Sequence, residues 1–343
     1  MKKLLNTLYI SNPDRYLSLD GENIVVSEDK TEIGRVPLHN LEAIVSQGYA
    51  GVSPALMGAC AERNISLCFM SMSGRFLARV TGCEHGNILL RKAQYRCADD
   101  PEISLRYAKN FIIGKLFNSR WIIERATRDY PLRVDCEKLK RVSGEIQNAM
   151  ISARNINDID ILRGIEGEAA SLYFSVFDEL ILQQKDDFHF SIRNKRPPLD
   201  NVNAMLSFAY TLLASMCASA LECVGLDPYE GFMHTERPGR KSLALDLMEE
   251  LRSILADRFV LSMINKKMVV KKDFITKEDG AVLLTDDARV NFIKEWQEKK
   301  QETMTHPFLG EKVEWGMVPY VQALLLARCL RGDLETYPPL MWK

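Results

Sequence analysis

The stretch Ser104–Thr127, "SLRYAKNFIIGKLFNSRWIIERAT", decides the fold class of the larger part of this chain. Its apolar residues at 105, 108, 112, 116 and 122–123 recur close to the period of an α-helix. Residues 159–182 and 286–300 follow the same kind of spacing. We therefore expect the chain from about Asn87 onward to be mostly helical.

The sequence before Asn87 consists instead of short β-rich runs. Residues 15–28, "RYLSLDGENIVVSE", flank Asp20-Gly21, which is a strong hairpin signal. Residues 65–82 predict a second hairpin around Ser73-Gly74, and residues 53–64 predict one short helix. Many short strands with a single helix indicate a small β-rich domain, so the fold class is α+β.

This change of pattern predicts the domain organisation. We expect residues 1–86 to form the β-rich domain, residues 87–100 a linker, and residues 101–343 an α-helical domain. The clearest loop of the helical part is residues 193–203, "RNKRPPLDNVN", because its two consecutive prolines disfavour helix on both sides.

The composition is that of an ordinary globular protein, with 343 residues, 46% hydrophobic and 27% charged. The formal net charge is -1. Nucleic-acid binding would therefore depend on local basic patches rather than on a global excess of cations. None of the eight cysteines is spaced as C-x-x-C, which gives no support to a zinc ribbon or a thioredoxin motif. We expect reduced cysteines and a cytoplasmic protein.

Residues 201–221 lack charged side chains over about the length of a membrane span. Asparagine, serine and threonine interrupt this stretch repeatedly, so we interpret it as a buried helix that ends before Gly225 and Pro228. The apolar part of "MKKLLNTLYI" is too short for a signal peptide. We expect no membrane partner.

Glu166 lies on an otherwise apolar helix face. That face is formed, at helical spacing, by Glu166, Ala170, Tyr173, Phe177 and Leu180. A carboxylate in such a stripe is costly unless a cation or hydrogen bonds compensate it. Two interpretations stay open: a functional carboxylate, or an ordinary glutamate favoured by a helix start near Gly164.

Residues 231–251, "GFMHTERPGRKSLALDLMEEL", join a histidine, a basic turn and an acidic helix. Asp246 and Glu249 are i, i+3 neighbours on that helix, which alone is typical of a solvated acidic face. His234, however, precedes a tight turn and can fold back over the helix. Imidazole with two carboxylates suits Mg²⁺ or Mn²⁺, which can activate a hydroxyl nucleophile and stabilise charge on a phosphate.

Basic residues adjoin this candidate site. Arg237, Arg240 and Lys241 lie in the turn itself, and further patches occupy 193–196 and 266–272. Cations beside a metal site indicate a polyanionic substrate, although each patch alone is more often a solvated face. Arg75 and Arg79 could either reach DNA or solvate an edge strand. The glycine patterns of Rossmann and P-loop proteins and the H-E-x-x-H motif are absent.

Four segments together resemble CRISPR-associated protein 1, the metal-dependent integrase of CRISPR spacer adaptation: "MKKLLNTLYI", "LRGIEGEAASLYF", "RPPLDNVNAMLSFAYTLL" and "GLDPYEGFMHTERPGRKSLALDLMEELR". Their order and spacing match over nearly the whole chain, and the version looks like the one that accompanies type I-C systems. The resemblance implies an N-terminal β-sandwich for dimerisation and DNA contact, followed by a larger, mostly α-helical catalytic domain.

The resemblance also implies the site. The glutamate motif of the family falls on Glu166, its histidine motif on His234, and its acidic helix on Asp246 and Glu249. The implied metal ligands are Glu166, His234 and Glu249, with Mg²⁺ or Mn²⁺ as the cofactor. Many members carry an aspartate where this chain has Glu249, which leaves open whether Asp246 or Glu249 is the direct ligand. We favour Glu249.

The implied reaction is transesterification, in which the 3′-hydroxyl of a protospacer strand attacks a phosphodiester at the edge of the CRISPR repeat. The implied partners are a second copy of the chain, CRISPR-associated protein 2 and double-stranded DNA. From charge and position we expect DNA contacts from five residues: Arg193, Lys195, Arg196, Arg237 and Lys241. Three alternatives are a metal-dependent nuclease without integration, a non-catalytic nucleic-acid-binding scaffold, and a metal hydrolase of small phosphorylated substrates.

Overall fold

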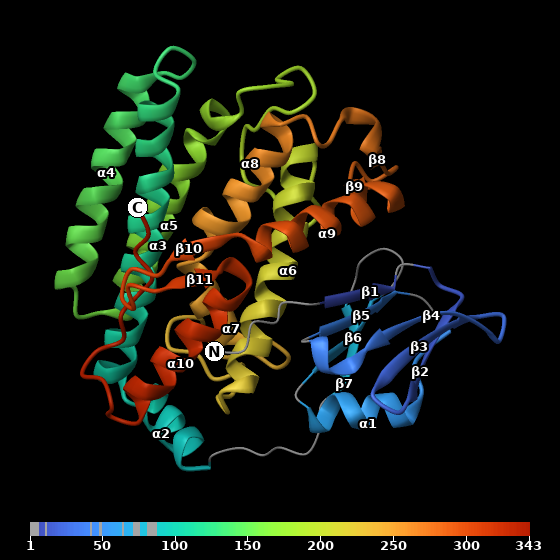
Figure 1. Cartoon of the computed structure of the whole chain (residues 1–343). Helices are drawn as coiled ribbons and strands as arrows, with labels where there is room; N and C mark the ends of the chain where they lie inside the picture. The colour runs from blue at the N-terminus through green and yellow to red at the C-terminus, as the bar shows by residue number, and fades with distance from the viewer. Residues whose placement is uncertain are drawn as a thin grey trace. The chain divides into compact units, whose positions relative to one another are not determined.

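The computed structural model describes residues 7–10, 12–41, 43–47, 50–63, 65–70, 76–80 and 88–343. The chain divides into two compact units. The first unit comprises Met1–His85 and Arg289–Gln301, and the second comprises Gly86–Ala288 and Glu302–Lys343. Figure 1 shows strands in the first part of the chain and mainly helices in the remainder.

The strands of the first unit form two β-sheets (Figure 1). The mixed sheet has the strand order β1 (Thr7–Ile10), β5 (Ala43–Gln47), β6 (Ser66–Met70) and β7 (Phe76–Val80). Its first three strands are parallel, and β7 pairs antiparallel with β6. The second sheet is antiparallel, with the order β2 (Arg15–Asp20), β3 (Asn23–Glu28) and β4 (Thr31–Pro37).

One hydrophobic core connects the two sheets. Leu17 and Ile24 of the antiparallel sheet, Ile44 and Leu67 of the mixed sheet, and Leu56 of helix α1 (Pro54–Glu62) are completely buried in it. The predicted two-sheet β-rich domain is therefore confirmed. The first hairpin turns at Gly21, whose φ of 57° is favourable for glycine. The predicted turn at Ser73-Gly74 and the predicted boundary at Gly86 lie outside the described residues.

The second unit is mostly helical, as predicted. Its helices are α2 (Ile88–Asp99), α3 (Pro101–Asp129), α4 (Cys136–Asn155), α5 (Ile159–Ser175), α6 (Asn201–Cys223), α7 (Ser242–Glu249), α8 (Arg258–Asn265) and α10 (Val318–Leu330). Two small hairpins accompany them: β8 (Phe274–Thr276) with β9 (Val282–Leu284), and β10 (Thr303–Thr305) with β11 (Lys312–Glu314). Helix α3 contains the stretch that decided the fold class, and it packs against α4, α5 and α7.

Most of the expected linker, from residue 88 to residue 99, is a helix. Residues Ile88–Asp99 form α2, and the side chain of Gln94 in this helix is completely buried. Gln94 donates to the carbonyl oxygens of Asp227 at 2.8 Å and Glu230 at 2.9 Å, and it accepts from the backbone N–H of Asp227. A glutamine that satisfies three backbone groups makes this helix part of the helical unit.

Residues Asp286–Gln301 form the predicted helix α9, but Arg289–Gln301 group with the β-rich unit. The predicted domain limits placed this helix in the catalytic domain. The periodicity of a sequence predicts that a helix forms, but it does not identify the elements against which the helix packs.

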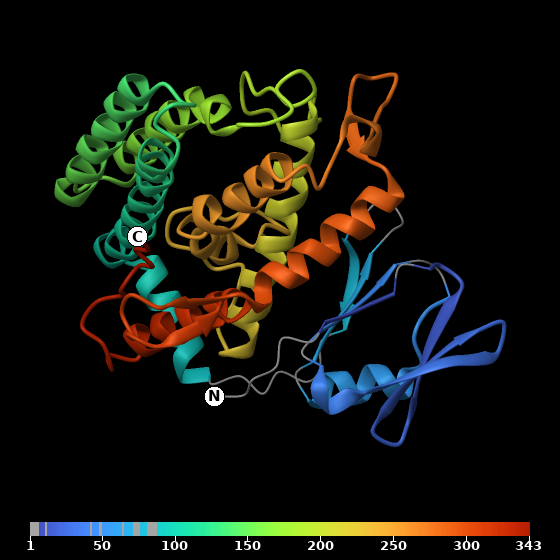
Figure 2. The ribbon, with the colours of Figure 1, turned by 45° about the horizontal axis from the view of Figure 1, so that its top comes forward.

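Helix α6 is the apolar stretch that met the length of a membrane span. Within the described residues, it is the one helix long and apolar enough for such a span, and 56% of the apolar stretch is buried inside the protein. It packs against α7, α8 and α10 (Figure 2). Leu206, Ala209 and Leu213 on its inner face are completely buried. These contacts are those of the core helix that the sequence predicted.

Candidate active site

Glu166 lies well inside helix α5. The helix begins at Ile159, and the side chain of Asp158 caps it by accepting from the N–H groups of Asp160 at 2.8 Å and Ile161 at 3.0 Å. The explanation of Glu166 as a residue of a helix start near Gly164 is therefore wrong. The sequence required a compensating cation for this carboxylate, and the structure supplies Lys115 of α3, whose ammonium donates to Glu166.

The loop before α7 carries His234, and Asp246 of α7 orients it. Nδ1 of the ring lies 2.6 Å from Oδ1 of Asp246, whose side chain is completely buried. The same carboxylate accepts from the backbone N–H groups of Phe232, Met233 and His234 at 2.7, 3.0 and 3.0 Å. An ionised carboxylate can only accept, so Nδ1 carries the proton and donates. Nε2 is consequently the ring nitrogen that can bind a metal.

Two further residues fix this loop. A Cβ at Gly231 would lie 2.8 Å from Oδ2 of Asp246 and 2.8 Å from Cβ of Ser242, so only glycine allows the loop to lie this close to α7. Arg163 of α5 donates to the carbonyl oxygen of Met233 through Nε at 3.1 Å and Nη2 at 2.7 Å. The helix that carries Glu166 is thereby bound to the residue that precedes His234.

Glu249 lies at the centre of the charged groups. Its side chain is 3% exposed. Oε2 lies 2.7 Å from Nζ of Lys115, while Oε1 lies 3.0 Å from Nη2 of Arg252 and 3.9 Å from Nε2 of His234. Burial by itself would raise the pKa of Glu249, but Arg252, Lys115 and His234 together lower this pKa to about 2. The carboxylate is therefore ionised at neutral pH.

The sequence-predicted residues Glu166, His234 and Glu249 thus come together: the ammonium of Lys115 pairs with both glutamates, and Nε2 of His234 lies 3.9 Å from Oε1 of Glu249. Within the described part of the chain, no three side chains of His, Cys, Asp or Glu form a ready metal cluster. The donor set nevertheless fits a divalent ion, because it combines carboxylate oxygens with an imidazole nitrogen, and the two glutamates already pair with one cation. Asp246 uses its oxygens to hold His234 and the loop, whereas Glu249 faces Nε2. The ligand assignment itself stays a prediction.

The sequence reasoning missed Lys115, Arg252 and Arg163. Lys115 follows Ile112 by three residues and Ala108 by seven, so its place on the apolar face of the helix was the available signal. Arg252 lies three residues after Glu249 and begins a π-helical turn, Arg252–Asp257. Single π-helical turns are frequent at functional sites, but they leave no clear pattern in a sequence.

The predicted DNA-contact loop separates into two parts. Arg193 is half-buried and makes contacts within the chain, while its DNA contact stays a prediction. It donates to Oδ1 of Asn203 at 2.6 Å and to Oγ of Ser207 at 3.2 Å, and its guanidinium lies 5.2 Å from the ring centre of Tyr210. Lys195 and Arg196 are exposed. Although Lys195 is exposed, part of its side chain is shielded from water. This desolvation, followed by the charge of the neighbouring Arg252, lowers the pKa of Lys195.

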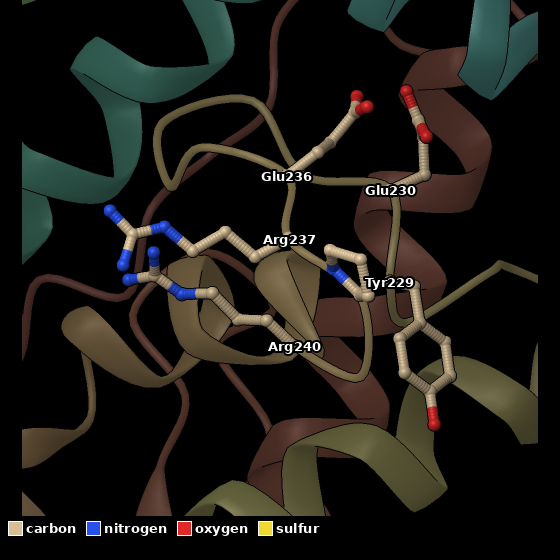
Figure 3. Close-up of a pocket in the computed structure, with 6 residues that line it drawn as sticks. Tyr229, Glu230, Glu236, Arg237 and Arg240 are labelled. Atoms are coloured by element: carbon tan, nitrogen blue, oxygen red, sulfur yellow. The ribbon is translucent and has the colours of Figure 1, made fainter.

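The basic turn after His234 lines a shallow pocket with Tyr229 and Glu230. Figure 3 shows the guanidinium groups of Arg237 and Arg240 extending away from the carboxylates of Glu230 and Glu236. Burial and the neighbouring Glu236 raise the pKa of Glu230 to about 7.

The other predicted basic residues differ in their surroundings. Arg237 is exposed, whereas Nζ of Lys241 lies 3.7 Å from Oε1 of Glu222. In the β-rich unit, Nε of Arg79 donates to Sγ of Cys68 at 3.5 Å. Arg75 lies outside the described residues.

The fold and this geometry define an α+β protein whose helical domain carries a buried site of carboxylates, an imidazole and two cations. The profile of the family "CRISPR associated protein Cas1" matches residues 8–298, and the chain belongs to this family.

Similar proteins support this family over the full length. The chain is 48% identical over 343 residues to CRISPR-associated endonuclease Cas1 1 of Chlorobaculum tepidum. It is 50% identical over 347 residues to CRISPR-associated endonuclease Cas1 2 of Rhodospirillum rubrum. Each comparison covers 100% of both chains.

Solved structures share the fold at lower identity. A casposase bound to its integration product is 22% identical with a TM-score of 0.83, covering 99% of this chain and 95% of that one. A Cas1 protein from Thermotoga maritima is 20% identical with a TM-score of 0.80, covering 97% and 99%. A Cas6-RT-Cas1–Cas2 complex is 22% identical with a TM-score of 0.80, covering 100% of this chain and 36% of that chain. The predicted α+β class is therefore confirmed.

Proposed function

We propose that this chain is a metal-dependent DNA integrase of CRISPR adaptation. It joins the 3′-hydroxyl ends of a protospacer to the CRISPR repeat by transesterification. The observation that carries the proposal is the convergence of Glu166, His234 and Glu249 from three separate segments. Full-length relatives named CRISPR-associated endonucleases support it, as does the fold shared with a casposase bound to an integration product.

The cofactor of this proposal is Mg²⁺ or Mn²⁺, held by carboxylate oxygens of Glu166 and Glu249 and by Nε2 of His234. When bound, such an ion would orient the attacking hydroxyl and neutralise charge on the phosphate. Asp246 holds the imidazole in the required tautomer and orientation. Arg252, fixed 3.0 Å from Glu249, adds a guanidinium that can stabilise negative charge developing on the phosphate oxygens.

The DNA backbone is bound in this proposal by exposed cations around the site, namely Lys195, Arg196 and Arg237. Lys241 also lies beside the site, although it is partly engaged by Glu222. Arg193 holds the Lys195–Arg196 loop against α6, and its predicted contact with DNA is untested. Binding through phosphate contacts releases counterions, so affinity for duplex DNA falls steeply with salt concentration.

The proposed partners are a second copy of the chain, CRISPR-associated protein 2 and double-stranded DNA, and the proposed location is the cytoplasm. Structural neighbours that contain a Cas1–Cas2 assembly or a Cas1–DNA complex support the assignments of CRISPR-associated protein 2 and of DNA as partners. The assignment to type I-C stays a prediction.

A second candidate function is DNA cleavage without joining, because the curated relatives carry the name endonuclease. The same groups would hydrolyse a phosphodiester if water took the place of the 3′-hydroxyl. The two functions differ only in the nucleophile, so the products distinguish them.

A strand-joining assay tests the proposal. The purified chain, with and without its small partner protein, meets a labelled duplex with 3′-hydroxyl ends and a repeat-containing plasmid, in Mn²⁺ or in EDTA. We expect labelled DNA covalently joined to the plasmid only with metal. Glu166→Ala and His234→Ala are expected to abolish joining while the dimer persists. Glu168→Ala is the matched control, because Glu168 is exposed on the same helix.

Each other outcome favours a different function. Cleaved DNA without joined product would favour the nuclease. DNA binding without any metal-dependent product, with the partner protein present, would favour a non-catalytic scaffold. Near-wild-type joining by either alanine variant would contradict the site assignment.

A further inference from the structure

Lys115 occupies the centre of the candidate metal site. Its ammonium donates to Oε1 of Glu166 and lies 2.7 Å from Oε2 of Glu249. The Lys115 side chain is only 9% exposed, and that of Glu249 is 3% exposed. Lysine is rarely buried to this extent unless it is paired, so the two carboxylates and the ammonium stabilise one another.

The packing of α3 fixes the base of this side chain. A Cβ at the preceding residue, Gly114, would lie 3.0 Å from Cβ of Glu250 and 3.1 Å from Cβ of Pro339. Glycine therefore allows α3 to approach the residue that follows Glu249. The lysine that comes next extends a flexible four-carbon stem from a rigid position.

The same carboxylate oxygens cannot serve the ammonium and a divalent ion together. Oxygens of Glu166 and Glu249 both pair with Nζ of Lys115, so a divalent ion held by these two carboxylates would compete with the ammonium for them. Two cations within a few ångströms repel each other strongly in a poorly hydrated site. Binding of such an ion would therefore require the Lys115 ammonium to leave at least one carboxylate.

We propose that Lys115 is a resident counter-ion and positioning residue of the metal site, an inference that rests on the proposed metal-dependent function. In the metal-free protein it holds Glu166 and Glu249 together and neutralises their mutual repulsion. When the divalent ion binds, Lys115 gives up these oxygens. Metal affinity is consequently lower than the ligand set alone would give, because part of the binding free energy is spent on breaking the ion pairs.

Measurement of Mn²⁺ binding to the full-length protein by electron paramagnetic resonance tests this exchange. Lys115→Met keeps the length of the side chain and removes its charge. We expect it to bind Mn²⁺ at least about tenfold more tightly than the wild type. We also expect its metal-free form to melt roughly 5 °C lower, with a larger rise on addition of Mn²⁺. Lys109→Met on the same helix is the control, because Nζ of Lys109 donates to the carbonyl oxygen of Arg154 at 3.3 Å near the surface and not to the site.

Lysine labelling of the wild-type protein, read by mass spectrometry, tests the displacement without any variant. We expect the Lys115 amine to be protected in the metal-free protein and to react once Mn²⁺ saturates the site, while exposed lysines react equally in both states. Unchanged labelling of Lys115 at saturating Mn²⁺, or an unchanged Mn²⁺ affinity of Lys115→Met, would overturn the inference and leave the proposed function intact. If neither protein bound Mn²⁺, the proposed metal-dependent function would fail as well.

Discussion

Each unit of the molecule contains ion pairs of similar length, but those compared here are exposed in the β-rich unit and buried at the candidate site of the helical unit. In the β-rich unit, Arg35 pairs with Asp20 at 2.6 Å and Glu32 at 2.7 Å, and the three side chains are 46%, 61% and 44% exposed. In the helical unit, Lys115 pairs with Glu249 at 2.7 Å, and their side chains are 9% and 3% exposed. The distances are similar, but water and salt screen only the first set of charges.

This difference indicates which charges serve a function. An exposed pair forms and breaks at little cost, so its presence says little about function. Burying a set of charges costs a large desolvation free energy, which ion pairs and hydrogen bonds must offset almost completely. The concentration of such charges around Glu249, with its pKa lowered to about 2, marks this site on physical grounds.

Among the substitutions that test this comparison of buried and exposed charges, Asp246→Asn should have the largest effect on activity. The amide can donate to Nδ1 of His234, which would place the ring proton on Nε2 and remove the proposed metal-binding atom. We expect the rate of strand joining to fall by at least about 100-fold, measured in single-turnover conditions with Mn²⁺. The control is Asp20→Asn, which makes the same change in a surface pair. A loss of less than about threefold in Asp246→Asn would show that the buried pair does not control His234.

The next largest effect should be a loss of stability, caused by removing a buried, uncharged side chain beside the site. Asn118 of α3 donates to the carbonyl oxygens of Glu250 at 2.7 Å and Leu340 at 2.6 Å, and it accepts from the N–H of Trp342 at 2.9 Å. Asn118→Ala leaves all three backbone groups without this partner, so we expect a loss of roughly 3 kcal/mol in the free energy of unfolding. Urea unfolding measures the change.

Asn155→Ala is the control for this prediction, because the Asn155 side chain is exposed and donates to the carbonyl oxygen of Ile151 in its own helix. An Asn118→Ala variant as stable as this control would contradict the importance of the contact.

The buried Asp257 makes stability depend on pH. Burial raises the pKa of this carboxyl from 3.8 to about 6, although Tyr210 donates to it at 2.6 Å. The unfolded chain therefore releases the proton at lower pH than the folded protein, and stability falls as pH rises between these values. Relative to Asp257→Asn, the wild type should lose roughly 1 kcal/mol of unfolding free energy between pH 5 and pH 7. Parallel pH profiles of the two proteins would contradict this assignment.

The smallest effect is expected in the β-rich unit. Arg35→Ala removes two exposed ion pairs, and solvent already screens these charges. We expect a melting temperature within about 2 °C of the wild type and unchanged strand joining. A shift of more than about 5 °C would show that exposure is the wrong criterion for comparing the two sets of charges.

The sequence predicted most of the fold because its signals are local. The Asp20-Gly21 turn predicted the first hairpin, and the apolar spacing of residues 104–127 predicted α3. The errors came from features that local patterns do not contain. Gln94 makes its contacts more than 130 positions further along the chain, and these contacts make residues 88–99 a packed helix instead of a linker.

The site was predictable as a set of acidic residues and a histidine, but not as a charge-balanced cluster. The apolar face around Glu166 predicted that a cation must compensate it, yet Lys115 lies 51 positions earlier and only the packing of α3 against α5 brings it there. Arg193 likewise makes contacts that the sequence did not predict. Its loop is basic and proline-rich, as a DNA-binding surface would be, and acceptors on α6 bind its guanidinium.

The nitrogen coordination of bound Mn²⁺ is the most direct test of the central claim that Glu166, His234 and Glu249 form a metal site. Electron spin echo modulation of Mn²⁺ bound to the full-length protein detects a directly coordinated imidazole nitrogen. We predict this nitrogen signal in the wild type and in His189→Ala, whose histidine is exposed, and its loss in His234→Ala. Bound Mn²⁺ without a nitrogen signal, or with a signal that persists in His234→Ala, would contradict the account.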